Sequence, residues 1–395
     1  MRKSGSTRHV ALCMGLNDFY DHGIVRGIIR YARRSRNWKL YGYGWMFRPL
    51  RDLRSWKGEG IIGRVENEAD ATEIAKLGLP VVDVAGAYTK YGFWRVTNDD
   101  FVTGQRAGIY LSSLGFDRFA FCGVSNVHWS ADRKDGFITA LDKQRSEVPA
   151  FERPLSWWEK TENIDGLTTW ISSLTRPIAV FACNDTAGLK LTAVCGKIGI
   201  AIPESVAIIG VDNEDIICEL ATPSLSSIML DCEEIGFEAA ALLDELISKE
   251  STNSCPFNRA DDERNDRLVK PREVVEREST RIFAYPNELV NQAMAIIHKE
   301  ARYGLKVGDV LARIPASPRN LEIKFQRYVG RSIHDEIIKS RLSYAKMLLC
   351  EGSQPLHVVV EESGFGSLQR FHEIFRKMEG CTPNEFREMH MNRNA

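Results

Sequence analysis

The sequence predicts an α/β sensor of two lobes built on parallel sheets, followed by an all-α domain with two helix-turn-helix units. Three observations lead to this prediction. A chain of 395 residues is too long for one ordinary hydrophobic core. Short apolar runs alternate with longer amphipathic runs over the first 280 residues, and from about Pro286 onward the pattern is helical throughout.

The apolar runs of the first part are each short enough to be one buried strand. Continuous apolar strands separated by helices are typical of a parallel sheet that is covered on both faces. The pattern begins at His9 and begins again near Asp117, which indicates two lobes. We expect strands at HVALCMG, KLYGYGW, GIIGRV, PVVDVAG, RFAFCGV, IAVFACND and VAIIGVD.

Amphipathic runs between these strands predict the helices of the sensor. They are DHGIVRGIIRYARRS, TGQRAGIYLSSLG, DGFITALDKQ, TAGLKLTAVCGKIG and EEIGFEAAALLDELISK. Residues 249–267 are polar, charged and without period, so we expect a solvated loop there. The run LVKPREVVERES after it could return as a strand. We therefore place the sensor at residues 1–282 and the helical domain at residues 283–395.

The composition of the chain argues against a secreted or a membrane-spanning protein. The net charge is -1, and the chain from Tyr285 onward carries 16 Lys and Arg against 13 Asp and Glu, a mild basic bias. Nine cysteines without a C-x-x-C pair indicate free thiols in a reducing compartment. The N-terminus lacks the apolar core of a signal peptide, and no run approaches the length of a membrane span. We expect a cytoplasmic protein.

The first helix-turn-helix unit is predicted by its capping residues. A short helix should end near Ile314, and Ser317 is placed to cap a second helix with Pro318 at its first position. Leu321 and Phe325 lie four residues apart and give that helix one apolar face.

The same plan recurs further along the chain. LHVVVEESGFGS reads as a short helix and turn, and Ser367 then caps a helix anchored by Phe371 and Phe375. A long helix should join the two units, with its apolar positions at Ile333, Ile337, Ile338, Leu342, Ala345, Leu348 and Leu349. A connector of about 18 residues spans roughly 27 Å. Since one turn of B-DNA is about 34–36 Å, the two second helices could enter successive major grooves. A helical bundle that contacts only protein is the alternative.

The helical domain resembles the AraC family of transcription regulators. The resemblance lies in SPRNLEIKFQRYVG, SRLSYAKMLL and EESGFGSLQRFHEIFRKMEGCTPNEFR, and covers about the last hundred residues. It implies that the last helix of each unit reads DNA. One departure is Ile323, which stands where a basic residue is usual in the family.

This resemblance and the helical spacing together give the expected DNA contacts. We expect Arg319, Gln369 and His372 to approach base edges, and Lys324, Arg327 and Arg376 to serve phosphates. Glu322 and Arg370 complete the expected DNA-facing set, and Glu322 could accept a hydrogen bond from cytosine N4.

The first 280 residues resemble the sugar-sensing domain of LacI-type repressors and the related type I periplasmic binding proteins. The motifs that carry the resemblance are VTNDDFVTGQRAGIYLSSLGFDRFAFCG, DRKDGF, FACNDTAGL, IPESVAIIGVDNED and PSLSSIMLDCEEIGFEAAALL. The resemblance implies a two-lobed periplasmic-binding-protein-like sensor with a sugar as its effector. In LacI-type repressors the DNA reader precedes this domain, whereas here it follows.

Polar residues at the ends of the expected strands predict the effector site. In open α/β sheets ligands bind at the carboxyl ends of strands, and carboxylates, amides and an arginine beside an aromatic ring suit a polyol. Asn17 is among the residues that follow the first strand. The motifs favour Asp99, Arg133, Asn184 and Asp212 as ligand residues, followed by Tyr20, Asp21 and Trp129. Helix capping or hydrogen bonding within a loop is the alternative role for each.

The sequence therefore predicts a sugar-responsive transcription regulator rather than an enzyme. No nucleotide-binding, serine-hydrolase or zinc-protease motif occurs, and no metal or cofactor is predicted. Expected partners are double-stranded operator DNA, a small sugar effector such as D-xylose, a second copy of the chain and, for an activator, RNA polymerase. No membrane partner is expected. The alternative is a sugar-binding or sugar-processing protein whose helical tail contacts only protein.

Overall fold

The computed structural model describes residues 7–16, 19–43, 50–65, 67–86, 91–141, 147–158, 160, 164–250, 266–283, 285–351 and 354–391. The chain forms two compact units. The larger unit comprises Met1–Tyr110 and Arg118–Thr280, and the smaller comprises Leu111–Asp117 and Arg281–Ala395. Most of the predicted solvated loop lies outside the described residues. In the part of the chain that is described, no helix has the length and apolar character to cross a membrane.

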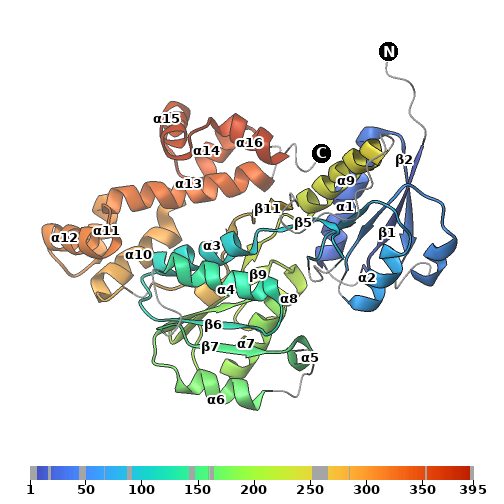
Figure 1. The fold of residues 1–395 in the computed structure, drawn as a ribbon. Coiled ribbons are helices and arrows are strands. Elements are labelled where there is room, and N and C mark those ends of the chain that lie inside the picture. Colours follow the sequence, from blue (N-terminus) through green and yellow to red (C-terminus); the bar gives the residue numbers. More distant parts are fainter. Residues whose placement is uncertain are drawn as a thin grey trace. The chain divides into compact units, whose positions relative to one another are not determined.

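The first sheet of the larger unit has the strand order β11-β5-β4-β3-β1-β2, and every pair is parallel. Figure 1 labels β1, β2, β5 and β11 of this sheet. Its strands are β1 (Arg8–Cys13), β2 (Trp38–Tyr43), β3 (Gly60–Gly63), β4 (Val81–Asp83), β5 (Trp94–Asn98) and β11 (Arg267–Val269). Its helices are α1 (Phe19–Ser35), α2 (Glu68–Ala75) and α9 (Cys232–Glu250), with a short 3-10 helix at Leu50–Ser55. Val10, Ala11, Ile61 and Ile62 are fully buried, as expected for central strands covered on both faces.

The second sheet has the order β12-β10-β9-β8-β6-β7, and only the pair of β10 with β12 is antiparallel. Its strands are β6 (Phe119–Val124), β7 (Ala150–Arg153), β8 (Ile178–Ala182), β9 (Val206–Asp212), β10 (Ser226–Met229) and β12 (Val274–Val275). Its helices are α4 (His128–Ala140), α5 (Leu155–Trp158), α6 (Asp165–Ser173), α7 (Asp185–Lys197) and α8 (Asp215–Leu220). The predicted two-lobed fold with parallel sheets is confirmed.

The chain passes between the two lobes more often than the sequence indicated. Helix α3 (Asp100–Ser113) follows β5 of the first sheet and packs on α4 beside the second sheet. Later, α9 and β11 return to the first sheet. Two glycines allow α9 to pack closely on α1, since a Cβ at Gly27 or Gly236 would lie 1.9 Å from a carbonyl oxygen of the opposite helix. Which of the two sheets an element joins depends on contacts between residues that are far apart in the sequence. The local periodicity of apolar residues does not reveal these contacts.

The smaller unit is helical, as predicted. Its elements are α10 (Glu288–Glu300), a 3-10 helix (Ala301–Tyr303), α11 (Val307–Arg313), α12 (Pro318–Val329), α13 (Ile333–Glu351), α14 (Leu356–Glu362), α15 (Leu368–Glu379) and α16 (Pro383–Met391). Ser367 caps α15 by accepting a hydrogen bond from the Arg370 N–H at 3.2 Å. Ser317 precedes α12 as predicted, but its side chain forms no capping hydrogen bond.

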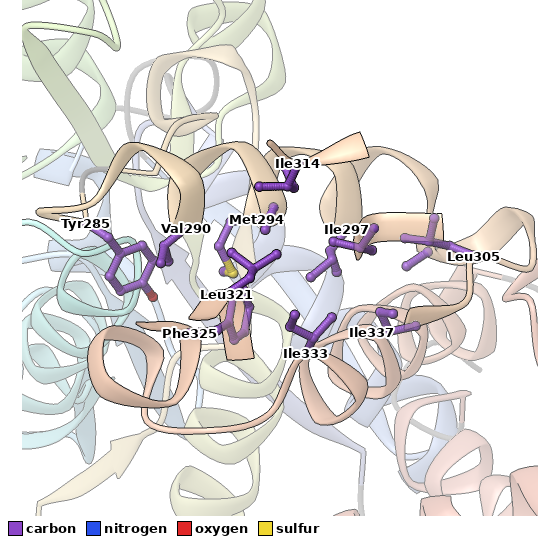
Figure 2. Packing of buried hydrophobic residues seen from close by; sticks show 13 residues of the cluster. Tyr285, Val290, Met294, Ile297, Leu305, Ile314, Leu321, Phe325, Ile333 and Ile337 are labelled. Atoms are coloured by element: carbon purple, nitrogen blue, oxygen red, sulfur yellow. The ribbon is translucent and has the colours of Figure 1, made fainter. Parts of the chain in front are cut away.

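Helix α13 contributes to two hydrophobic cores, one for each helix-turn-helix unit. Ile333 and Ile337 pack with Leu321 and Phe325 of α12 in the first core (Figure 2). The remaining predicted apolar positions of α13 pack with α14, α15 and α16 in the second core. All seven predicted positions are buried. The helix of 19 residues therefore joins the two helix-turn-helix units through packing at both ends.

Candidate functional sites

The predicted effector site is built on a close contact between α3 and α4. A Cβ at Gly104 would lie 1.9 Å from the carbonyl oxygen of Arg133, and a Cβ at Gly136 would lie 1.9 Å from that of Phe101. Only glycine permits such an approach of two helix backbones. As a result, Asp100 at the start of α3 lies beside Arg133 in the second turn of α4.

Arg133 connects several of the predicted ligand residues. Its Nε donates to Asp100 Oδ1 at 2.8 Å, and one terminal nitrogen donates to the carbonyl oxygen of Cys183 at 2.5 Å. The same nitrogen lies 3.9 Å from Asp212 Oδ1 at the end of β9. The guanidinium also lies over the Trp129 ring, 5.1 Å from its centroid. We call Asp100, Trp129, Arg133 and Asp212 the Arg133 cluster.

The Arg133 cluster holds a buried cation between two carboxylates. The side chain of Arg133 is 6% exposed, whereas that of Asp212 is 31% exposed. Burial acts to lower the pKa of Arg133, but the charges of Asp100 and Asp212 outweigh this and raise the pKa. A permanently charged donor beside partly accessible carboxylate oxygens can bind neighbouring hydroxyl groups, each of which donates and accepts.

Tyr20 and Asp21 approach this cluster from the lobe of the first sheet. The Tyr20 hydroxyl donates to the carbonyl oxygen of Val84 at 2.9 Å. Its pKa is raised well above the ordinary value by burial, and the charges of Asp100 and Arg133 also act on it. Asp21 is 2% exposed and accepts hydrogen bonds from Arg64 and from the Leu16 N–H, each at 2.9 Å. Arg64 also lies over the Tyr20 ring, 5.4 Å from its centroid.

Two of the predicted ligand residues act as helix caps. Asp99 Oδ1 accepts from the Val102 N–H at 3.0 Å at the start of α3. Asn184 Oδ1 accepts from the Ala187 N–H at 2.9 Å at the start of α7. Asp99 is adjacent in sequence to Asp100, whose carboxylate contacts Arg133. Asn184 is adjacent to Cys183, whose carbonyl oxygen contacts Arg133. Asn17 lies outside the described residues.

Two charged residues of this region were absent from the predicted site. The sequence predicts Asp99 as a ligand residue, whereas in the structure it is Asp100 that pairs with Arg133. Arg64, which pairs with Asp21, follows β3 directly. The position of Arg64 at the carboxyl end of a parallel strand was a usable signal in the sequence.

Helix α15 presents a polar face to solvent. Its buried face carries Phe371 and Phe375, both fully buried. Gln369 and Arg376 are exposed and lie seven residues apart, on the opposite side of the helix. Arg370 is also exposed, and His372 is half-buried beside Phe371, with 6.3 Å between ring centroids. Gln369 donates to the exposed Glu373 at 3.2 Å, an acidic neighbour that the prediction omitted.

The polar face of helix α12 carries basic residues and one acidic residue. Arg319, Glu322 and Arg327 are exposed, whereas Lys324 is half-buried. Ile323 is 59% exposed and lies opposite the buried Leu321 and Phe325. An apolar side chain in this place can contact a thymine methyl group in the major groove but cannot hydrogen-bond a base.

Family comparisons match the two units separately. Residues 9–98 match an "XylR N-terminal domain", residues 109–280 a "Periplasmic binding protein-like domain", and residues 310–389 a "Helix-turn-helix domain". With the fold and the two candidate sites, these matches define a transcription regulator in which a periplasmic-binding-protein-like sensor precedes an AraC-type DNA-binding domain.

Regulators of one operon type are similar to this chain over nearly its whole length. The "Xylose operon regulatory protein" of Escherichia coli strain K12 is 29% identical, and the alignment covers 97% of each chain. The protein of the same name from Haemophilus influenzae is 28% identical over 96% of this chain and 97% of its own length. A solved structure, "structure of xylose-binding transcription activator xylR", is 27% identical with a TM-score of 0.58, covering 98% of this chain and 99% of that one. These relatives are regulators, which confirms the prediction that the chain is not an enzyme.

Proposed function

We propose that this protein is a cytoplasmic, homodimeric activator of a pentose catabolic operon, with D-xylose as its effector and operator DNA and RNA polymerase as partners. The Arg133 cluster is the observation that carries the proposal, because it combines a buried cation, two carboxylates and an aromatic ring in the sensor unit. The names of the relatives that align over the whole chain support xylose as the sugar.

Effector binding would act by shifting the population of sensor conformations. A ligand that binds one conformation more tightly than another shifts the equilibrium toward it by its difference in binding free energy. Tyr20 and Asp21 come from the lobe of the first sheet, whereas Trp129, Arg133 and Asp212 come from the other lobe. A sugar that contacts both groups would favour one arrangement of the lobes and so change how the two DNA-reading helices are presented.

A thermal-shift screen of the full chain tests the sugar assignment. Free pentoses, hexoses, sugar acids and polyols are compared at equal concentration, because selective binding to the folded state raises the melting temperature. We expect D-xylose to give the largest shift, and we expect Asp212→Ala to abolish it. A selective shift by another sugar would replace xylose as the effector, and no shift by any sugar would refute the sugar response.

Two substitutions on α15 test the DNA-binding assignment. Arg376→Ala should weaken binding to all DNA sequences alike and reduce the slope of log affinity against log salt by about 1, because one phosphate contact is lost. Gln369→Ala should relax sequence preference by about 1–3 kcal/mol at one base pair and leave the salt slope unchanged. Fluorescence anisotropy with operator and unrelated duplexes measures both effects. Wild-type binding by both variants at several salt concentrations would contradict the assignment.

A further inference from the structure

The turn that carries Asp212 has an unusual backbone. Asp212 has a φ of 105° and Asn213 a φ of 53°, so two successive residues other than glycine lie in the left-handed region. Such conformations cost free energy and persist only where the surroundings enforce them. Asp212 is the last residue of β9, and we call residues 212–214 the Asp212 turn.

Asp185, at the start of α7, holds this turn from the interior of the protein. It is 1% exposed, and its Oδ2 accepts from the Glu214 N–H at 2.9 Å. Its Oδ1 accepts from the Ser227 hydroxyl at 2.6 Å, and the Ser227 oxygen in turn accepts from the Asn213 N–H at 3.0 Å. Asp185 therefore fixes two successive backbone N–H groups of the Asp212 turn, one directly and one through Ser227.

The surrounding chain is shaped to accommodate this carboxylate. A Cβ at Gly210 would lie 2.2 Å from Asp185 Oδ1, so only glycine leaves room for the side chain at that position of β9. On another side of the turn, Arg277 donates to Asn213 Oδ1 at 2.9 Å and to the Leu225 carbonyl at 3.0 Å. The Asp212 turn is thus fixed by side-chain contacts from α7, β10 and the segment after β12.

We propose that Asp185 is a positioning residue for effector binding, which holds the Asp212 turn in its left-handed conformation so that the Asp212 carboxylate lies beside Arg133. The inference rests on the proposed function, since it takes Asp212 and Arg133 to bind the sugar. None of the hydrogen bonds of Asp185 described above joins it to a residue of the Arg133 cluster. It acts on the sugar only through the backbone of residues 212–214.

The ionised form of Asp185 is the one that can hold the turn. Both of its oxygens face donors, from Ser227, Glu214 and the Cys218 thiol, the last at 3.4 Å. Protonation would convert one acceptor oxygen into a donor and break one of these contacts. Burial raises the pKa of Asp185 to about 7, while its hydrogen bonds and the charge of Arg277 act in the opposite direction. Effector affinity should therefore fall as the pH is lowered from 8 to 6.

The test measures D-xylose affinity of the full chain by calorimetry for wild type, Asp185→Asn and the double variant Asp185→Asn/Asn213→Gly. We expect Asp185→Asn to weaken binding by about tenfold, because the amide replaces one acceptor oxygen with a donor and a buried donor that faced this oxygen loses its acceptor. The double variant should recover at least part of the affinity, because glycine adopts positive φ at no steric cost. The wild-type loss of affinity between pH 8 and pH 6 should be absent in Asp185→Asn.

Two further variants keep the test decisive. Glu336→Gln is the matched control, because Glu336 is a carboxylate of the smaller unit that is only 2% exposed. This variant should leave D-xylose affinity unchanged. If Asp185→Asn does not fold, Ser227→Ala removes the hydroxyl between Asp185 and the Asn213 N–H and should weaken binding in the same way.

The outcomes separate this inference from the proposed function. Wild-type affinity in Asp185→Asn, or a double variant no better than Asp185→Asn, would overturn the positioning role while the sugar response stands. If the wild type bound no sugar at all, the proposed function would fail and the positioning role would fail with it.

Discussion

Replacing Arg133 with alanine is expected to abolish the response to sugar, with a loss of affinity of at least a hundredfold. The guanidinium supplies the donors of the Arg133 cluster and neutralises Asp100 and Asp212. Its removal leaves Asp100 without its buried partner, and breaking a buried ion pair typically costs about 3–5 kcal/mol. Calorimetry with D-xylose and thermal denaturation without it separate the loss of binding from the loss of stability.

Two control variants make the Arg133 result interpretable. Arg26→Ala removes an exposed arginine from the same unit and should leave both affinity and melting temperature close to wild type. Arg133→Lys keeps the charge but loses the planar set of donors that reaches both Asp100 and the Cys183 carbonyl, so we expect intermediate binding. Undiminished sugar binding by Arg133→Ala would show that the effector site lies elsewhere.

Replacing Phe371 with alanine is expected to open the second helix-turn-helix unit and to abolish operator binding. Phe371 is fully buried and packs against Phe365 and Phe375, with ring centroids 5.0 Å and 5.4 Å away. A Phe-to-Ala change in a core costs about 3–5 kcal/mol through lost burial and the cavity left behind. Hydrogen exchange of the full chain should show faster exchange in α14–α16, because local opening becomes easier.

Met378→Ala is the matched control on the same helix. Met378 is 53% exposed, so its truncation should change the free energy of local opening by at most about 0.5 kcal/mol. Operator affinity should remain close to that of the wild type. Equal exchange rates for Phe371→Ala and the wild type would mean that the core of the second unit does not stabilise α15 as described.

The helical domain could be predicted in detail because its signals are local. The apolar positions of α13 recur at helical spacing, and all seven are buried in the structure. Ser367 lies at the start of α15 and caps it as expected. Helix periodicity and capping act over a few residues, so one sequence contains the information needed.

The strands of the sensor were predicted less completely. All seven apolar runs predicted as strands gave strands close to their expected positions, but β5, β7 and β10 were missed. Each of these has four or five residues, and β5 (WRVTN) and β10 (SSIM) contain polar residues. Their strand conformation depends on pairing with neighbours far along the chain, and short windows of sequence do not contain this pairing.

The site was predicted as a region rather than as a set of contacts. Of the four residues favoured by the motifs, Asp99, Asn184 and Asp212 lie at the carboxyl end of a strand or at the start of a helix, as the topology rule anticipates, whereas Arg133 lies in the second turn of α4. The choice of Asp100 over Asp99 as the partner of Arg133 depends on the approach of α3 to α4 through Gly104 and Gly136. Likewise, the support of the Asp212 turn by Asp185 requires contacts between β9, α7 and β10. Neither arrangement follows from spacing along the chain.

Operator binding with and without D-xylose tests the central claim most directly. The full chain is titrated into a labelled duplex from the promoter it controls, and the affinity is measured by fluorescence anisotropy at fixed salt. A sugar-responsive regulator predicts that D-xylose changes the operator affinity by about 5–150-fold and that Arg133→Ala removes this change. The same affinity with and without the sugar, for a protein that binds both ligands, would contradict the coupling between the sensor and the DNA-binding unit.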